Sequence, residues 1–271
     1  MTMINNTEVF KKYASSFDVN VKAIKMKLEH SLKVADVAKK IAEDVFEGNA
    51  EYCEVAYNAG LLHDVARFYQ WKTYETFNDF NSIDHGDYGV EILFGKGEGK
   101  NQIKNYNIAK KWYGYLFLAI KFHNKLAIDD EFVGEYCKKE KMDFDLAVTL
   151  CKITRDADKV DITRVVGEGE SAVSVPKNID LSLKGYSKEI IGAFNNRTSC
   201  DFQYRKTVLD YAIGYMAFLF ELYYDISKTL VQPYLNGYLS VISKIYGTCL
   251  DIEDLKILKK LCNEVKKEIK K

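Results

Sequence analysis

The sequence is poor in net charge, closely spaced cysteines, proline and long apolar runs. Lysine and arginine total 39, the same number as aspartate and glutamate, so the formal net charge is zero. This balance lacks the basic excess of proteins that bind nucleic acids or membrane surfaces, and we expect neither as a partner. The six cysteines lie far apart with no CxxC pair. Their spacing argues against a zinc ribbon or a disulfide framework and indicates free thiols in a reducing compartment.

No apolar run is long enough to cross a bilayer. The most apolar stretch, residues 211–220, is bounded by Asp210 and Glu221, whereas a spanning helix needs about 20 apolar residues. The first residues, MTMINNTEVF, lack the basic and then apolar design of a signal peptide. We therefore expect a soluble, cytoplasmic protein.

The scarcity of proline leaves room for long helices. Only Pro176 and Pro233 occur, and apolar residues recur at helical spacing along nearly the whole chain. No run alternates apolar and polar residues for long enough to indicate a sheet, so the sequence predicts an all-α fold. The expected helices cover residues 22–46, 51–68, 84–95, 105–124, 142–164, 186–195, 203–228, 232–247 and 251–270. Loops are expected at residues 73–84 and 167–179.

Histidine is scarce too, and its few positions are informative. The chain has four histidines. His30 shares an apolar stripe of its predicted helix with residues 34, 37 and 41. His63 lies in the apolar segment AYNAGLLHDVARF and is followed at once by Asp64, while His123 ends the stripe formed by residues 112, 116 and 120. Asp158 follows residues 150 and 154 at four-residue steps, so imidazoles and acids alike are predicted to face inward.

A metal centre explains these inward polar residues together. A buried carboxylate is costly unless it is paired or coordinates a metal. Imidazole nitrogen and carboxylate oxygen are the ligands that divalent iron, manganese, cobalt, nickel or zinc accept. The two oxygens of Asp64 could also bridge two ions, as paired-metal hydrolytic sites require. The alternative, separate packed histidines and ordinary acids, accounts for each residue alone but not for the burial pattern that they share.

The order of these residues resembles the HD-domain superfamily, whose pattern is a histidine, then His-Asp, then a distant aspartate, all on helices. The matching positions are His30 in KLEHSLKVA, His63 and Asp64 in GLLHDVAR, and Asp158 in RDADKVD. The resemblance covers about residues 20–165 and implies a helical bundle. Residues 166–271 are then a helical C-terminal extension, which we expect to pack on the same domain.

The resemblance also implies a ligand set for two divalent transition-metal ions. His85 and His123 match the two extra histidines of members that hold two metals. The first ion would take His30, His63, Asp64 and Asp158, and the second ion would take Asp64, His85 and His123. Asp161 shares the inward stripe of its helix and is the alternative to Asp158.

The activity implied by this resemblance is metal-dependent phosphate hydrolysis. The stretch LLHDVARFYQW…TFNDFNSIDHGDYGVEILF is similar to bacterial HD proteins described only as predicted metal-dependent phosphohydrolases. In that chemistry a metal-activated water attacks a phosphate ester or anhydride, here of a small, nucleotide-like substrate. Asp64 and Arg67 are the expected catalytic residues, and Arg67 and Lys159 are the expected phosphate-binding residues. Asp87 is either an acid near the second metal or a helix cap, and we favour the cap.

Several alternatives stay open. The aromatic residues just after the His-Asp pair, at positions 68, 69, 71, 74 and 77, either line a pocket for a nucleobase or pack in the core. The same six ligands occur in mixed-valent di-iron oxygenases of the superfamily, so the ligand set alone does not separate hydrolase from oxygenase. A non-catalytic regulator with a bound metal is the third hypothesis. A homodimer is the protein partner left open.

Overall fold

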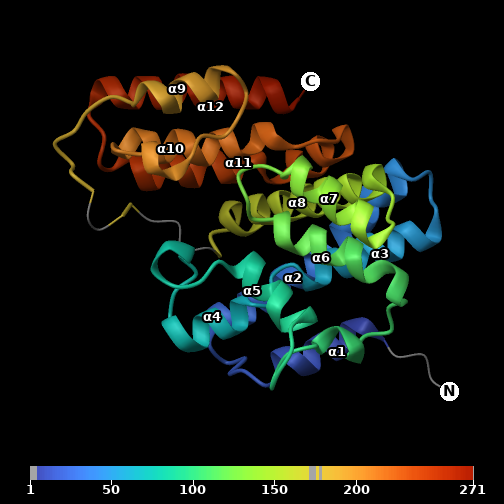
Figure 1. Ribbon diagram of the computed structural model, residues 1–271. Coiled ribbons are helices and arrows are strands. Elements are labelled where there is room, and N and C mark those ends of the chain that lie inside the picture. The colour runs from blue at the N-terminus through green and yellow to red at the C-terminus, as the bar shows by residue number, and fades with distance from the viewer. Residues whose placement is uncertain (1–4, 171–174, 177–178, 271) are drawn as a thin grey trace. The chain divides into compact units, whose positions relative to one another are not determined.

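The computed structural model describes residues 5–170, 175–176 and 179–270, and these form helices joined by turns, with no strand among them (Figure 1). The predicted all-α class is confirmed. Within the same residues, no helix combines the length and the apolar character needed to cross a membrane. The chain divides into two compact units, Met1–Asp158 and Lys159–Lys271, with the division inside one long helix. The predicted packing of residues 166–271 on the preceding domain stays a prediction.

The first unit contains the helices and turns that carry the predicted ligands. The helices are α1 (Asn6–Ala14), α2 (Lys22–Val45), α3 (Ala50–Leu62), α4 (Arg67–Tyr74), α5 (His85–Phe94), α6 (Tyr113–Phe122), α7 (Asp130–Glu140) and the beginning of α8 (Phe144–Gly167). Short 3-10 turns occur at η1 (Asp79–Asn81), η2 (Gln102–Asn105) and η3 (Lys110–Trp112). The predicted helices at residues 22–46, 84–95 and 142–164 are close to α2, α5 and α8.

Several helix predictions for this unit are wrong, and the helix expected at residues 105–124 begins only at Tyr113, after η2 and η3. The predicted helix at residues 51–68 breaks after Leu62, and α4 begins only at Arg67, so the His-Asp pair lies in a turn between two helices. Helices α1 and α7 were not expected. Each buries only a few residues, and α7 buries just Val133 and Cys137. So few buried residues do not establish a helical period in the sequence.

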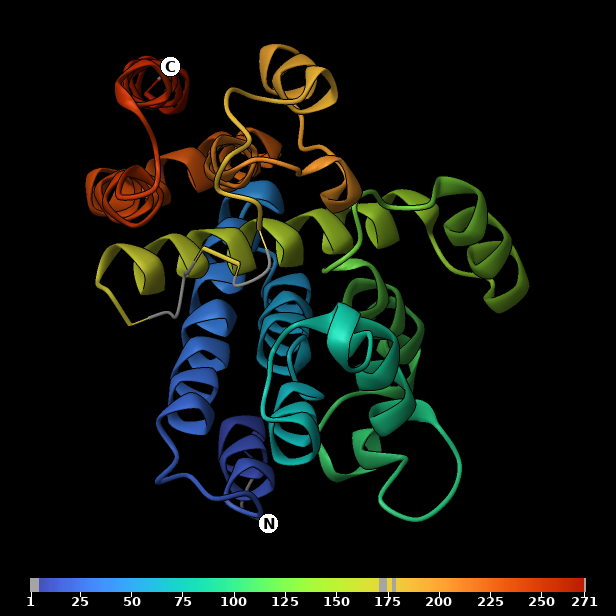
Figure 2. The same cartoon turned by 90° about the vertical axis from the view of Figure 1, so that its left-hand side faces the viewer.

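The pairing of α2 with α3 forms the centre of the first unit, and Figure 2 shows the two helices side by side. Small residues allow this approach. A Cβ added to Gly60 would lie 2.8 Å from the carbonyl oxygen of Val34 and 3.0 Å from the Cβ of Ala38. Glycine at this position therefore lets the end of α3, with His63 just beyond it, come against the middle of α2, where His30 lies.

The second unit is a smaller helical group that follows the rest of α8. It comprises α9 (Lys188–Asn195), η4 (Phe202–Tyr204), α10 (Val208–Ala217), η5 (Phe218–Glu221), α11 (Asp225–Gly247) and α12 (Ile252–Ile269). Helix α10 packs against α9, α11 and α12. The single helix predicted at residues 203–228 is wrong, because η4, α10, η5 and the start of α11 divide that stretch. The loop predicted at residues 167–179 lies partly outside the described residues.

Candidate metal centre

The structure brings all six predicted ligands together within the first unit. His30 lies in the middle of α2, and His63 caps the C-terminal end of α3. His85 is the first residue of α5, and His123 caps the end of α6. The acids come from the turn after α3 and from α8. The four histidines and Asp64 are at most 5% exposed, and the side chain of Asp158 is 16% exposed.

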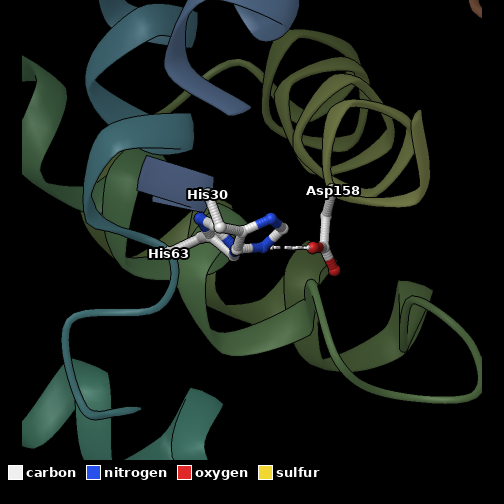
Figure 3. A group of neighbouring side chains, drawn as sticks. All are labelled: His30, His63 and Asp158. Atoms are coloured by element: carbon white, nitrogen blue, oxygen red, sulfur yellow. Dashed lines mark hydrogen bonds and ion pairs between the residues drawn. The ribbon is translucent and has the colours of Figure 1, made fainter. Parts of the chain in front are cut away.

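The first group of ligands consists of His30, His63 and Asp158, whose donor atoms lie close enough to share an ion. The Nε2 atom of His30 is 3.1 Å from Oδ1 of Asp158, and Nε2 of His63 is 3.5 Å from the same oxygen. Figure 3 shows the two imidazoles next to the carboxylate, which approaches them from the neighbouring helix. Helix α2, the C-terminal cap of α3 and helix α8 therefore supply one group of donors.

The carboxylate of Asp64 faces two different pairs of histidines with its two oxygens. Oδ2 lies 3.6 Å from Nε2 of His30 and 3.5 Å from Nε2 of His63. Oδ1 lies 3.4 Å from Nε2 of His85 and 3.7 Å from Nε2 of His123. This is the arrangement that a carboxylate needs to bridge two ions, one on each oxygen.

Hydrogen bonds on the far side of the rings orient three of the histidines. Nδ1 of His63 lies 2.7 Å from the carbonyl oxygen of Gly60, and Nδ1 of His123 lies 2.7 Å from that of Ile120. Because a carbonyl oxygen only accepts, we assign the ring hydrogen to Nδ1 in both residues. Nδ1 of His85 lies 2.5 Å from the carboxylate of Asp79. In each case the Nε2 lone pair is directed into the cluster, as in metal sites where a hydrogen bond fixes the ligating histidine.

The donor atoms are arranged to bind divalent metal ions rather than to hydrogen-bond with one another. Nε2 of His63 is buried and has no hydrogen-bond partner among the described residues. Nε2 of His85 and Nε2 of His123 are 2.9 Å apart, and with both Nδ1 atoms protonated two lone pairs would face each other. Burial lowers the pKa of His63, and it lowers the pKa of His85 to about 3. The rings of His63 and His85 are thus held neutral, the form that binds metal.

The acids of the cluster are held ionised. Burial by itself would raise the pKa of Asp64, but the positive charges of Lys27 and Arg67 hold this pKa well below its usual range. Burial likewise opposes ionisation of Asp158, and the imidazoles of His30 and His63 beside it keep its pKa well below the usual range. Anionic carboxylates beside neutral imidazoles are the donor set of divalent transition-metal sites.

Arg67, the predicted phosphate-binding residue, lies beside Asp64. Its Nε is 3.3 Å from Oδ1 of Asp64, and its Nη1 donates to the carbonyl oxygen of Phe77 at 2.7 Å and to Oδ1 of Asp79 at 2.9 Å. Nη2 has no hydrogen-bond partner among the described residues, and the side chain is 13% exposed. The guanidinium therefore has one nitrogen left for an oxygen of a bound substrate.

The other candidates have protein partners. The ammonium of Lys159 lies 3.9 Å from a carboxylate oxygen of Glu221 within the second unit. Asp161, the alternative to Asp158, pairs with Arg164 at 2.7 Å.

Asp87 has no hydrogen bond or ion pair with the histidines among the described residues, and it is not the cap that we favoured. It pairs with two lysines on the surface. The cap of α5 is Asp84, whose side chain accepts from the backbone nitrogen of Asp87. Of the aromatic residues, Phe68 is fully buried and is therefore excluded from a nucleobase pocket.

Sequence reasoning missed two residues that contact the ligands directly. The ammonium of Lys27 lies 2.7 Å from Oδ2 of Asp64. Its position three residues before His30, one turn along α2, was a usable signal. Asp79 accepts from His85, Arg67 and the side-chain amide of Gln70. It lies in a loop, where no periodicity marks an inward residue.

The segment that supplies these donors matches a known protein family. Residues 28–162 match the family model of the HD domain, and the matched segment contains all six predicted ligands. No curated protein and no solved structure matches the chain.

Proposed function

Because the chain belongs to the HD-domain superfamily and its buried donors surround both oxygens of one carboxylate, we propose that it is a metal-dependent phosphohydrolase or phosphodiesterase. The proposed reaction is hydrolysis of a phosphate ester or anhydride in a small, nucleotide-like substrate. One observation carries the proposal: Oδ1 and Oδ2 of Asp64 each face a separate pair of imidazole nitrogens. A single structural ion would not need that second pair of donors.

Each ligand has a proposed place. One ion would be held by His30, His63, Asp64 and Asp158, and the second by Asp64, His85 and His123. When bound, such ions lower the pKa of a coordinated water towards neutrality and stabilise charge on phosphoryl oxygens. The protein fixes the donors beforehand, because His63, His85 and His123 are each held through Nδ1. Iron, manganese, cobalt, nickel and zinc all suit these donors.

Two cationic side chains favour an anionic substrate. Lys27 and Arg67 contact opposite oxygens of Asp64, at 2.7 and 3.3 Å. The nitrogen of Lys27 and the guanidinium carbon of Arg67 lie 5.4 and 5.7 Å from the centre of the Phe77 ring. An arginine fork and an ammonium are the usual phosphate-binding groups of proteins. We assign phosphate binding to this pair rather than to Lys159, whose ammonium pairs with Glu221 in the second unit.

The proposal is tested by a phosphate-release screen. The purified protein, loaded in turn with manganese, iron, cobalt and nickel, is offered nucleotides and simple phosphate esters. We expect metal-dependent release of phosphate or of a nucleotide that an Asp64→Asn variant does not support. A preference for nucleotides over simple esters would support the nucleotide-like substrate.

Two other results would replace the proposal. Oxygen uptake with ferrous iron, without phosphate release, would establish the oxygenase alternative. Bound metal without turnover of any substrate class would favour the regulator.

A further inference from the structure

The buried arginine Arg155 on α8 holds the turn that follows α6. Its side chain is 2% exposed. Nη1 donates to the carbonyl oxygen of Phe122 at 2.8 Å and to that of Lys125 at 2.5 Å, and Nη2 donates to that of Leu126 at 3.2 Å. The last carbonyls of a helix have no partner within the helix. One guanidinium therefore satisfies three backbone oxygens of a single turn, through charge-assisted bonds.

This turn carries His123 and, next to it, Asn124. The side-chain amide of Asn124 donates to Oδ2 of Asp79 at 3.3 Å, the same oxygen that lies 2.5 Å from Nδ1 of His85. The turn also fits closely against the start of α5, since a Cβ on Gly86 would lie 2.4 Å from Oδ1 of Asn124. A displacement of the turn would consequently move His123 directly and disturb the support of His85.

Arg155 and Asp158 are three residues apart on α8, which places them about one turn from each other on neighbouring faces. Asp158 contacts the histidines of the first group, and Arg155 holds the turn that carries a histidine of the other. We propose that Arg155 is a positioning residue that fixes the His85–His123 pair relative to the Asp158 group. This role rests on the two-ion site of the proposed function and adds to it a residue that touches neither ion nor substrate.

The test uses Arg155→Lys, which keeps the positive charge but loses the planar fork that reaches three carbonyls. Arg197→Lys is the matched control, because Arg197 also donates to the last turn of a helix, at Phe194 of α9 in the second unit. Both variants are checked for an unchanged helical circular dichroism spectrum. The four histidines of the chain are all in the site, so nitrogen-15 labelling of histidine reports on the site alone.

In the metal-free protein, Arg155→Lys should shift the ring nitrogen signals of His123 and His85 and leave those of His30 in place. Manganese titration should then show an affinity for one ion reduced by roughly 10- to 100-fold, the usual effect of losing an outer contact of a metal ligand. The affinity for the other ion should change by less than about threefold. Arg197→Lys should alter neither measurement.

Equal shifts of all four histidines, or none, would overturn the proposal, and so would an equal change in both affinities. Neither readout involves hydrolysis, so a wild-type protein that releases no phosphate would refute the proposed function and leave this test intact. A wild-type protein that binds one ion would refute the two-ion site, and the histidine signals would still decide the role of Arg155.

Discussion

Each unit of the molecule buries a carboxylate, and the two are partnered in opposite ways. Asp210, in the second unit, is fully buried. It accepts from the backbone nitrogens of Ser187, Lys206 and Thr207 and from the hydroxyl of Ser187, at 2.7 to 3.0 Å. Asp64, in the first unit, faces four imidazole nitrogens and two cationic side chains. The carboxylate of Asp210 accepts hydrogen bonds mainly from backbone nitrogens of nearby residues. The carboxylate of Asp64 is instead surrounded by side chains of the kinds that bind metals and anions.

This difference in partners distinguishes a structural acid from a candidate metal ligand, although both are buried. Both acids are removed from water, so burial alone predicts the same cost for each. What differs is the partner. Backbone donors fix a loop to a helix end, as Asp210 does at the start of α10, where it completes a capping box with Thr207. Neutral imidazoles that direct lone pairs towards a carboxylate leave room for a cation between them. The contrast can be tested by changing one acid at a time.

The largest effect is expected from Asp64→Asn. The amide keeps the size of the side chain and an oxygen for Lys27 or Arg67, but it cannot bridge two cations as an anion. Both ions should be lost together, and turnover should fall by on the order of 10³-fold or more, because the metal-activated water and its charge stabilisation disappear together. Metal analysis and phosphate release measure the two effects. Retention of both ions would remove Asp64 from the centre of the site.

His85→Ala should remove one ion only. The Asp158 group keeps its donors, so the metal content should halve while the fold remains intact. Turnover should drop by at least about 10²-fold, the loss expected when a charge-stabilising group is removed. The same result is expected for His123→Ala. A wild-type content of one metal per chain, unaffected by His85→Ala, would show that the second group binds no ion.

Asp210→Asn is the counterpart in the second unit. The amide would present an NH₂ group to backbone donors, so the free energy of unfolding should decrease by about 2–3 kcal/mol, as expected when hydrogen bonds to a buried charge are lost. Denaturant unfolding measures this change. Metal content should stay at the wild-type value, since no predicted ligand lies in the second unit. A variant that is as stable as wild type but loses metal would show that Asp210 supports metal binding rather than stability.

The smallest effect is expected from Asp79→Asn. This change weakens the hydrogen bond that Asp79 accepts from His85 but replaces none of the predicted ligands. The affinity for one ion should weaken by roughly tenfold, the lower end for outer contacts of metal ligands. The affinity for the other ion should be unchanged, and isothermal titration with manganese resolves the two. If both affinities change equally, Asp79 serves the loop as a whole rather than His85.

His30, His123 and Asp158 could be predicted to face inward because helical periodicity reveals which side of a helix is buried, whereas His85 was selected by the family resemblance. His30 and Asp158 lie on apolar stripes, and the histidines are so few that their shared burial is noticeable. Asp79 could not be found in this way, since its loop has no period. The turn at His63 was missed because residues 59–68 are mostly apolar, and an apolar run looks the same in one helix or two.

The contacts of charged side chains were the least predictable part of the site. Lys27 lies one turn before His30 on its helix, which indicates an inward position, but only the approach of α3 to α2 identifies Asp64 as its partner, 2.7 Å away. The pairing of Lys159 was equally absent from the sequence pattern. Its neighbour Asp158 suggested a place beside the substrate, which stays a prediction, and the fold of the second unit places Glu221 3.9 Å from its ammonium. Pairing of this kind depends on which helices meet, and local sequence does not contain that information.

The most direct test of the account is a crystal structure of the manganese-loaded protein with anomalous data. We expect two anomalous peaks, one on either side of the Asp64 carboxylate, each with nitrogen and oxygen donors at about 2.0–2.2 Å. One peak should be bound by His30, His63 and Asp158, and the other by His85 and His123. A single peak, or peaks that do not contact Asp64, would contradict the central claim that this carboxylate bridges two ions.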